Sequence, residues 1–377
     1  MTNVSSTTTA AGTSTSVTSL PPQAIGRWQH RLADGRVCCD VCPRHCTLRD
    51  GQRGFCFVRS NHDGTIVLDT YGRSSGFAMD PVEKKPLNHF YPGSSVLSFG
   101  TAGCNSACRY CQNWSISTSR QWSTLAVEAS PERIARTAVD YGARSVAFTY
   151  NDPIVFAEYA IDTAEACREL GVNAIAVTAG YMSAVARTDF YRVMDAANID
   201  LKGFTEDFYR NVTGTHLADV LDTIAYVCNE TNVWVELTTL LIPGYNDDDA
   251  QLHAECVWIR EHCGRDVPLH FSAFHPDYRM RDVPPTPLDT LTRARDIAIG
   301  EGLRFVYTGN VTDQDGDTTW CPQCGGTLIV RDWYEIESYR LTADGRCPEC
   351  GCVIPGRWDT TADFQGFGRR SWRIPMR

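Results

Sequence analysis

Three cysteines lie close together in the first half of the chain, at Cys104, Cys108 and Cys111. Thiolates with this C-x₃-C-x₂-C spacing in one loop can each bind a different iron of a single cubane cluster. The fourth iron then has no protein ligand and is open to another molecule. Zinc is the alternative, but structural zinc prefers four protein ligands and no fourth Cys or His lies close by in the sequence. The spacing therefore favours a [4Fe–4S] cluster.

Two groups of four cysteines flank this loop. The later group consists of two C-x₂-C pairs, each followed by Gly, and predicts a zinc ribbon with an auxiliary iron–sulfur centre as the alternative. Its members are Cys321, Cys324, Cys347 and Cys350. The earlier group has tighter spacing, for which zinc is favoured and an auxiliary [4Fe–4S] cluster is the rival. Its members are Cys39, Cys42, Cys46 and Cys56, and Cys38 could replace Cys39 as a ligand.

Composition limits the function classes. The chain has 377 residues, a formal net charge of −10 and 17 cysteines. Dense cysteine without a basic or apolar stretch at the start of the chain predicts a cytoplasmic protein that uses cysteine for metal or redox chemistry. No apolar run is long enough to cross a membrane, so no membrane association is expected. The acidic balance makes nucleic acid an unlikely partner, because phosphate binding needs clustered Lys and Arg.

The elements that must position the central cysteines alternate between strand and helix. From Ser94 to Asn310, short apolar runs typical of buried parallel strands are separated by amphipathic segments with helix start and stop signals. The expected strands are Ser95–Phe99, Ser145–Thr149, Asn173–Thr178, Ile199–Leu201, Val233–Leu241, Leu269–Phe274 and Arg304–Tyr307. This pattern predicts an α/β fold with a partial or full (β/α) barrel, and a doubly wound sheet is the structural alternative. Either fold places ligands at the carboxyl ends of the strands.

The chain is expected to divide into several parts. A small Cys-rich metal-binding unit precedes the barrel, and a zinc ribbon follows it. The predicted segments are a disordered Ser/Thr-rich tail at 1–22, the Cys-rich unit at 23–65, a connector at 66–93, the barrel at 94–312, the ribbon at 318–358 and a tail at 359–377. The run Glu83-Lys84-Lys85 is interpreted most simply as part of a solvated connector.

The central motif, with an aromatic residue before its last cysteine and placed after the first barrel strand, resembles that of the radical S-adenosylmethionine (SAM) enzymes. Asp200-Leu201-Lys202 and Ile242-Pro243-Gly244 resemble the strand-end motifs of the activating enzymes that install glycyl radicals in partner proteins. The order of motifs over about 36–356 is closest to the radical SAM enzymes of the AmmeMemoRadiSam system. These motifs are the four-cysteine unit and segments like Asp80–Phe90, Tyr150–Pro153, His270–Tyr278 and Tyr307–Asn310.

The resemblance implies a [4Fe–4S] cluster on Cys104, Cys108 and Cys111, with SAM bound to the open iron. Tyr110 would pack on the adenine, and Lys202 would pair with the SAM carboxylate or, in the alternative, with Asp200 or Glu236. The chain departs from its relatives at Asp152, where Glu is usual, and at Thr239, where activating enzymes have His. The remaining positions expected to bind cofactor are Asn113, Asn151, Thr178, Asp200, His275 and Asn310. Glu236 is expected either to face the barrel lumen and touch substrate or to form an ion pair.

The implied function is reductive cleavage of SAM, followed by hydrogen-atom abstraction from an unidentified substrate. Ferredoxin or flavodoxin would supply the electron, and Memo-type and AMMECR1-type proteins would be companions. The alternative within this chemistry is an activating enzyme that acts on a protein partner. The alternative from another functional class is a zinc-ribbon protein that binds nucleic acid or has a regulatory role.

Overall fold

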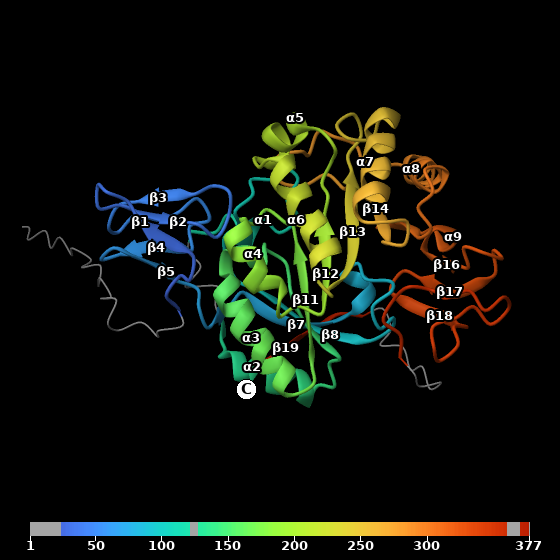
Figure 1. Cartoon of the computed structure of the whole chain (residues 1–377), viewed down its shortest axis with the longest axis horizontal. Coiled ribbons are helices and arrows are strands. Elements are labelled where there is room, and N and C mark those ends of the chain that lie inside the picture. Colours follow the sequence, from blue (N-terminus) through green and yellow to red (C-terminus); the bar gives the residue numbers. More distant parts are fainter. Residues whose placement is uncertain (1–23, 121–126, 360–369, 377) are drawn as a thin grey trace, which may run out of the picture.

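The centre of the molecule is a nine-stranded, mostly parallel sheet (Figure 1). The computed structural model describes residues 24–120, 127–359 and 370–376. The strand order is β15-β14-β13-β12-β11-β10-β8-β7-β19. The seven parallel strands are β8 (Ser95–Gly100), β10 (Ser145–Phe148), β11 (Asn173–Thr178), β12 (Ala196–Asp200), β13 (Trp234–Leu241), β14 (Leu269–Ala273) and β15 (Val306–Gly309). All seven predicted strands are thus confirmed, with ends shifted by a few residues.

Helices connect these strands in sequence. The parallel strands are neighbours in chain order, with no reversal of direction across the sheet. Because crossovers between parallel strands are right-handed, this order places the connecting helices on one face, as in a barrel rather than a doubly wound sheet. The helices in these crossovers are α2 (Pro131–Asp140), η5 (Pro153–Phe156), α3 (Ala157–Glu169), α4 (Ala184–Tyr191), α5 (Glu206–Phe208), η6 (Tyr209–Thr213), α6 (Leu217–Glu230), α7 (Asp249–His262) and α8 (Leu288–Gly300). Since β15 and β19 are unpaired at the two edges of the described sheet, the barrel is partial.

Two strands of the sheet come from segments that the sequence predicted as connector and tail. Strand β7 (Gly76–Pro81) pairs antiparallel with β8, and β19 (Trp372–Ile374) pairs antiparallel with β7. The turn η3 (Val82–Lys84) follows β7 and carries Glu83, which is only 4% exposed. Lys85 is also buried, so the interpretation of this run as solvated is wrong. Lys85 pairs with Asp80 and Glu83 faces Arg331, and these opposite charges offset part of the cost of burial.

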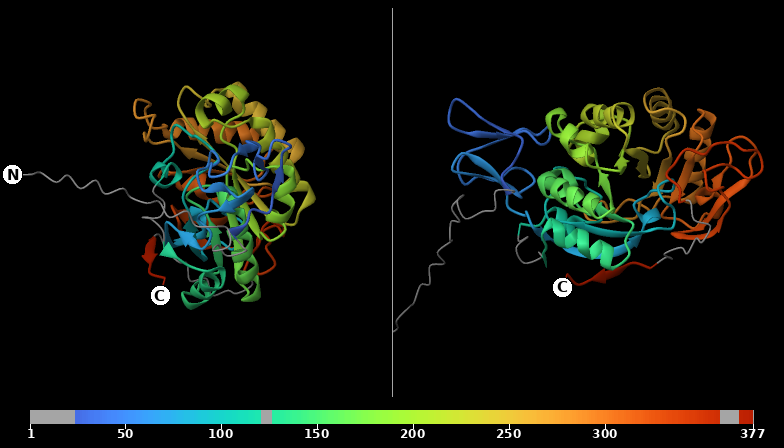
Figure 2. Two further views of the ribbon diagram at one scale, coloured as in Figure 1. Left: turned by 90° about the vertical axis from the view of Figure 1, so that its left-hand side faces the viewer. Right: turned by 60° about the horizontal axis from the view of Figure 1, so that its bottom comes forward.

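The two cysteine-rich units lie at opposite ends of the central domain (Figures 1 and 2). The N-terminal unit has a three-stranded sheet and a hairpin: β1 (Gln29–Arg31), β2 (Val37–Cys39), β3 (Cys46–Leu48), β4 (Arg59–His62) and β5 (Thr65–Leu68). The C-terminal unit is a three-stranded sheet of β16 (Thr319–Trp320), β17 (Thr327–Asp332) and β18 (Glu335–Tyr339). Its apolar core includes Phe305 and Tyr307 of the barrel, so the ribbon packs directly on β15.

A few short elements complete the part of the chain that is described. They are the two-stranded sheet of β6 (Arg73–Ser74) and β9 (Val127–Glu128), and the short helices α1 (Trp114–Ser117) and α9 (Gln314–Asp317). The predicted tail at 1–22, and most of the tail at 359–377, lie outside the described residues. No helix in the described ranges is long and apolar enough to cross a membrane.

Candidate active site

A cavity of about 280 Å³ lies at the carboxyl ends of the parallel strands. Loops that follow five of the parallel strands, and residues inside β13 and β14, contribute to its wall, which is where a parallel barrel is expected to bind ligands. Eleven of the thirteen predicted cofactor-site residues line it: Cys104, Cys108, Tyr110, Cys111, Asn113, Asn151, Asp152, Thr178, Asp200, Lys202 and Asn310. The structure therefore brings together residues that are more than 200 positions apart in the sequence.

The cysteine loop after β8 is fixed by backbone contacts. The amides of Ala107 and Arg109 donate to the carbonyl oxygens of Thr213 (2.7 Å) and Val212 (2.9 Å) in η6. The side chain of Asn105 donates to the carbonyl of Tyr181 at 2.8 Å. These contacts hold the loop across the strand ends. The backbone that carries the three thiols is therefore fixed by hydrogen bonds next to the cavity.

The three thiols are arranged for something larger than a single ion. Among the described residues, only two groups bring three or more candidate ligand atoms within 4.8 Å of one another, and neither contains Cys104, Cys108 or Cys111. A cubane cluster separates its cysteine ligands more widely than one tetrahedral ion does, so the spread fits a cluster. Burial raises the pKa of Cys104, and it raises the pKa of Cys108 to about 11. Positively charged iron would offset that cost by stabilising the thiolates.

Asp200 and Lys202 form an ion pair at the end of β12, with Nζ to Oδ2 at 2.7 Å. Burial acts to lower the pKa of Lys202, but Asp200 and the nearby Tyr110 and Cys108 raise it well above its ordinary value. Lys202 is therefore a fixed positive charge beside the cysteine loop. The backbone amide of Lys202 donates to the Tyr209 hydroxyl at 3.0 Å, which holds the strand end in place.

Asn151 and Asp152, after β10, are already engaged with the protein. The Asn151 amide accepts from the Thr101 backbone N–H (2.9 Å) and donates to the carbonyl of Gly103 (2.8 Å), so it braces the entry to the cysteine loop. Asp152 accepts from the backbone of Ala179 and the hydroxyl of Thr178, both at 2.9 Å. Burial raises the pKa of Asp152 in spite of these bonds.

Two predicted residues do not reach the cavity. Thr239 is fully buried on the opposite side of β13, where its hydroxyl donates to the carbonyl of Leu201 at 2.8 Å and bonds Glu255 of α7. Side chains alternate along a strand, and Thr238 and Leu240 are the residues that line the cavity. His275 is exposed on the loop after β14, away from the cavity lining. The structure therefore does not bring these two residues together with the other eleven, and cofactor binding by them stays a prediction.

The sequence missed several lining residues, among them Tyr150, Thr238 and Ser272. Ser272 lies inside an apolar strand, so only the parity of the strand could have signalled that its hydroxyl faces inward. Tyr150 follows β10 with a φ of 71°, an uncommon backbone angle for a tyrosine, and its hydroxyl donates to Asp80 at 3.1 Å. This bond ties the rim of the cavity to the buried Asp80–Lys85 pair.

The two flanking groups of cysteines differ in geometry. In the ribbon, the sulfurs of Cys321 and Cys350 are 3.6 Å apart and those of Cys324 and Cys347 are 3.7 Å apart. A tetrahedral zinc site with Zn–S bonds of about 2.3 Å has ligand sulfurs about 3.8 Å apart. The ribbon group therefore has the geometry of a zinc site.

In the N-terminal group, Cys39 lies near Cys42 and Cys56, whereas Cys38 has a different partner. The Cys38 thiol donates to Asp40 at 3.4 Å and lies in a separate group with His30. Burial, together with the nearby thiols of Cys56, Cys39 and Cys46, raises the pKa of Cys42 to about 12. Cys42 therefore has the other three predicted cysteines as neighbours, and the Cys56 carbonyl lies against Gly103 at the start of the central loop.

The chain matches the model of the radical SAM superfamily over residues 99–257, which includes the cysteine loop and most of the cavity wall. This chain is a radical SAM enzyme. It is 24% identical over 233 residues to the pyruvate formate-lyase 1-activating enzyme of Escherichia coli, covering 57% of this chain and 93% of that protein. The radical SAM enzyme described here is thus related to the glycyl-radical activating enzymes.

Two further similarities accompany this match. An uncharacterized protein of Methanocaldococcus jannaschii is 42% identical over 322 residues, which is 85% of this chain and 96% of that protein. The crystal structure of a radical SAM methyltransferase from Sphaerobacter thermophilus aligns with a TM-score of 0.46 and 15% identity over 63% of this chain and 71% of that one. The radical SAM family implies a [4Fe–4S] cluster and SAM as cofactors.

Proposed function

We propose that this enzyme holds a [4Fe–4S] cluster on Cys104, Cys108 and Cys111, binds SAM beside it, and abstracts a hydrogen atom from a substrate in the barrel. The observation that carries the proposal is one cavity that contains the three thiols, the Asp200–Lys202 pair and Asp152. When bound and reduced, the cofactors supply a 5′-deoxyadenosyl radical, and the protein orients them and excludes water.

The residues of the cavity can bind the distinct groups of SAM. Lys202 offers a fixed positive charge for the carboxylate, and Asp152 offers a buried acceptor for the amino group. Tyr110, only 6% exposed, offers a flat apolar face to the adenine. Asn151 holds the cysteine loop against the strand ends through the Gly103 carbonyl, so its role is to position this loop rather than to contact SAM.

The wider proposal follows the predicted family. Ferredoxin or flavodoxin delivers the electron, the enzyme works in the cytoplasm, and companion proteins of the Memo and AMMECR1 types act with it. Installation of a glycyl radical in a protein partner is the second candidate, favoured by the similarity to the pyruvate formate-lyase 1-activating enzyme. Zinc occupies the C-terminal group, and the N-terminal group is a further metal site whose metal is zinc or an auxiliary [4Fe–4S] cluster.

The test is iron, sulfide and zinc content after anaerobic reconstitution, with 5′-deoxyadenosine measured after reduction by dithionite. The wild type is expected to form 5′-deoxyadenosine and to contain at least about four irons per chain. Replacing Cys104, Cys108 or Cys111 by Ala should remove about four irons and abolish the product. Cys167→Ala is the matched control, because Cys167 is a buried thiol of α3 outside every cysteine group. Product formation by any of the three loop variants would contradict the proposal.

A further inference from the structure

A second cavity of about 410 Å³ adjoins the cofactor cavity. The two share seven lining residues, so a ligand in the second cavity would lie next to bound SAM. The shared residues are Pro86, Gln112, Asn113, Thr149, Tyr150, Ser272 and Asn310. Its other walls come from η3, from β14 and β15, from Asp317 of α9 and from Trp333 and Tyr334 at the turn of the ribbon hairpin. We call this space the inner chamber, and its volume suits a small molecule.

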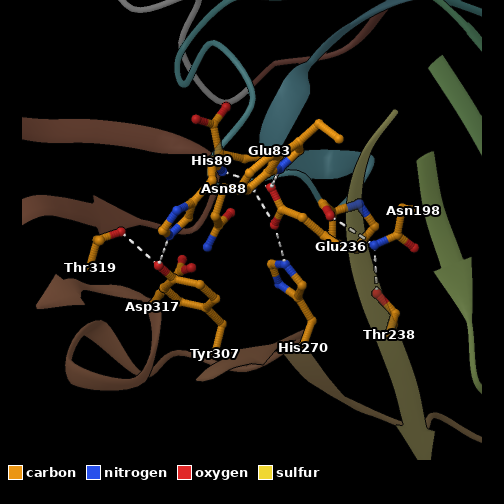
Figure 3. A network of polar contacts seen from close by, with 12 residues as sticks. Glu83, Asn88, His89, Asn198, Glu236, Thr238, His270, Tyr307, Asp317 and Thr319 are labelled. Atoms are coloured by element: carbon orange, nitrogen blue, oxygen red, sulfur yellow. Dashed lines mark hydrogen bonds and ion pairs between the residues drawn. The ribbon is translucent and has the colours of Figure 1, made fainter. Parts of the chain in front are cut away.

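A histidine held by a carboxylate lines the inner chamber. The Nε2 atom of His270 bonds Glu236 at 2.7 Å, and both side chains are buried (Figure 3). Glu236 also accepts from the backbone amides of Asn88 (2.9 Å) and His89 (2.7 Å) and from the Trp234 indole (3.0 Å). Although burial acts to raise the pKa of Glu236, the stronger combined effect of His270, His89 and the Asn88 amide lowers it, which favours the carboxylate form.

This arrangement fixes the tautomer of His270. A carboxylate accepts only, so in the neutral ring Nε2 carries the proton and Nδ1 is the acceptor. No described residue forms a hydrogen bond with Nδ1, on a ring that lines the chamber. The His270 ring also stacks on Tyr307, with centroids 5.1 Å apart. Position and orientation are thus set by the protein, and the remaining nitrogen is left for a ligand.

The charges around the chamber are not balanced. Lys84 and Lys85 line it, but both pair with Asp80, at 3.1 and 2.6 Å. On the other side, Glu83 faces Arg331 of the ribbon at 4.0 Å, and Asp317 lines the wall nearby. Apart from His270, the charged chamber residues and their direct partners comprise four carboxyl groups and three cations. The carboxyl groups are Asp80, Glu83, Glu236 and Asp317, and the cations are Lys84, Lys85 and Arg331.

Two carboxyl groups of the chamber are costly to ionise in the free protein because they are buried. Burial raises the pKa of Glu83 to about 7, because Arg331 offsets the loss of water only in part. Burial likewise raises the pKa of Asp317 to about 6. One oxygen of Glu83 is enclosed with no hydrogen-bond partner. A ligand that brings one positive charge would restore the balance for both carboxylates.

We infer that the inner chamber is the substrate site of this enzyme and that it binds a small organic amine in its protonated form. His270 accepts a hydrogen bond from the ligand, and Glu83 and Asp317 supply the complementary charge. Glu236 is a positioning residue that acts through His270. This inference rests on the proposed function for its placement beside SAM, and it specifies the substrate class that the proposed function leaves open.

The test measures binding to the reconstituted full-length enzyme with SAM at pH 8, by saturation-transfer NMR. The probes are n-butylamine and two molecules of similar size, 1-butanol and butyrate. The amine is expected to bind at least about tenfold more tightly than butyrate, because one uncompensated charge pair contributes about 1.4 kcal/mol or more. Glu83→Gln and His270→Gln should each weaken amine binding about five- to tenfold. Glu255→Gln is the matched control, since Glu255 is a buried carboxyl outside the chamber that bonds Thr239.

Two outcomes would overturn the inference. Butyrate binding as tightly as n-butylamine would show that the chamber does not select a cation. Amine binding that both Glu83→Gln and His270→Gln leave unchanged would place the amine elsewhere. The comparison of probes on wild-type protein needs no variant, so poor folding of one variant does not remove the test. Formation of 5′-deoxyadenosine by the same sample shows separately whether the proposed function holds.

Discussion

Gly103 lies directly against the backbone of Cys56: a Cβ atom at Gly103 would come within 2.1 Å of the Cys56 carbonyl oxygen. The two residues belong to different metal-binding groups, since Cys56 is in the N-terminal unit and Gly103 begins the central cysteine loop. The backbone of Gly103 also has a φ of +78°, which a residue with a side chain rarely adopts. The loop that presents Cys104 is therefore packed against the N-terminal unit at a position that only glycine fits.

Gly103→Ala should displace the cysteine loop. The new methyl group has no room, so Cys104 must move, and we expect at least about half of the iron of the central site to be lost, with a similar loss of 5′-deoxyadenosine. Gly142→Ala is the control, because Gly142 has a φ of +67° but no atom within 4 Å of a Cβ. It carries only the backbone cost, about 1 kcal/mol. Equal iron content in the two variants would show that the contact with Cys56 is not needed.

Cys324→Ser should remove one zinc per chain and leave the iron content unchanged. The four ribbon sulfurs lie close enough for one tetrahedral ion, and a serine hydroxyl is a poor ligand for zinc in place of a thiolate. Cys352→Ser is the control, since Cys352 lies beside this group but is not one of its four members, and its thiol donates to the carbonyl of Val353 at 3.6 Å. Loss of iron in place of zinc would identify the ribbon as an auxiliary cluster site.

The barrel strands could be predicted from the sequence because strands buried on both faces are continuous apolar runs. The strand β10, with all four residues buried, is an example. Strand β7 could not be predicted in this way, because it ends in Asp80-Pro81 and precedes Glu83 and Lys85. Charged residues of this kind are typical of a solvated connector, and the sequence alone does not show that they have buried partners. Strand β19 pairs with β7 across nearly 300 residues, and no local pattern signals such a pairing.

The site could be predicted where chemistry determined residue type, as for the three cysteines and the Asp200–Lys202 pair. Site residues could not be predicted where the direction of a side chain determines whether it faces the cavity. Thr239 and Thr238 are adjacent and alike, yet only Thr238 faces the cavity. The role of His270 needed its bond to Glu236, 34 residues away. The inner chamber depends on the ribbon packing against η3, where Arg331 faces Glu83 from nearly 250 residues away in the sequence.

Glu83→Gln should make the free energy of unfolding less sensitive to pH. Glu83 keeps its proton up to about pH 7 in the folded protein but only to about pH 4.5 when unfolded. The folded state therefore binds more protons between these values, and the wild type loses stability as the pH rises from 4.5 to 7. Glutamine does not titrate, so we expect the variant to gain about 1–3 kcal/mol relative to wild type between pH 5 and pH 8.

Urea unfolding at pH 5 and pH 8 measures this difference. Comparing the two pH values cancels pH-independent effects of the substitution, such as its effect on the contact with Arg331. Glu261→Gln is the control: Glu261 is an exposed carboxylate 3.6 Å from Arg260, and its replacement should show no such pH dependence. A difference between Glu83→Gln and wild type that is the same at both pH values would show that Glu83 does not titrate in this range.

Glu158→Gln should loosen the N-terminal unit from the barrel. Glu158 of α3 pairs with Arg59 of β4 through bonds of 2.6 and 2.7 Å, and both side chains are almost completely buried. Removing one charge leaves the Arg59 guanidinium in the interior without a counter-ion, which costs about 3–5 kcal/mol. Asp266→Asn breaks the exposed pair with Arg304 and should cost less than about 1 kcal/mol. Because Cys56 packs on Gly103, the larger loss should also lower the iron content of the central site. Urea unfolding and iron analysis of the two variants check both expectations, and a cost for Glu158→Gln as small as that of the control would contradict this account of the interface.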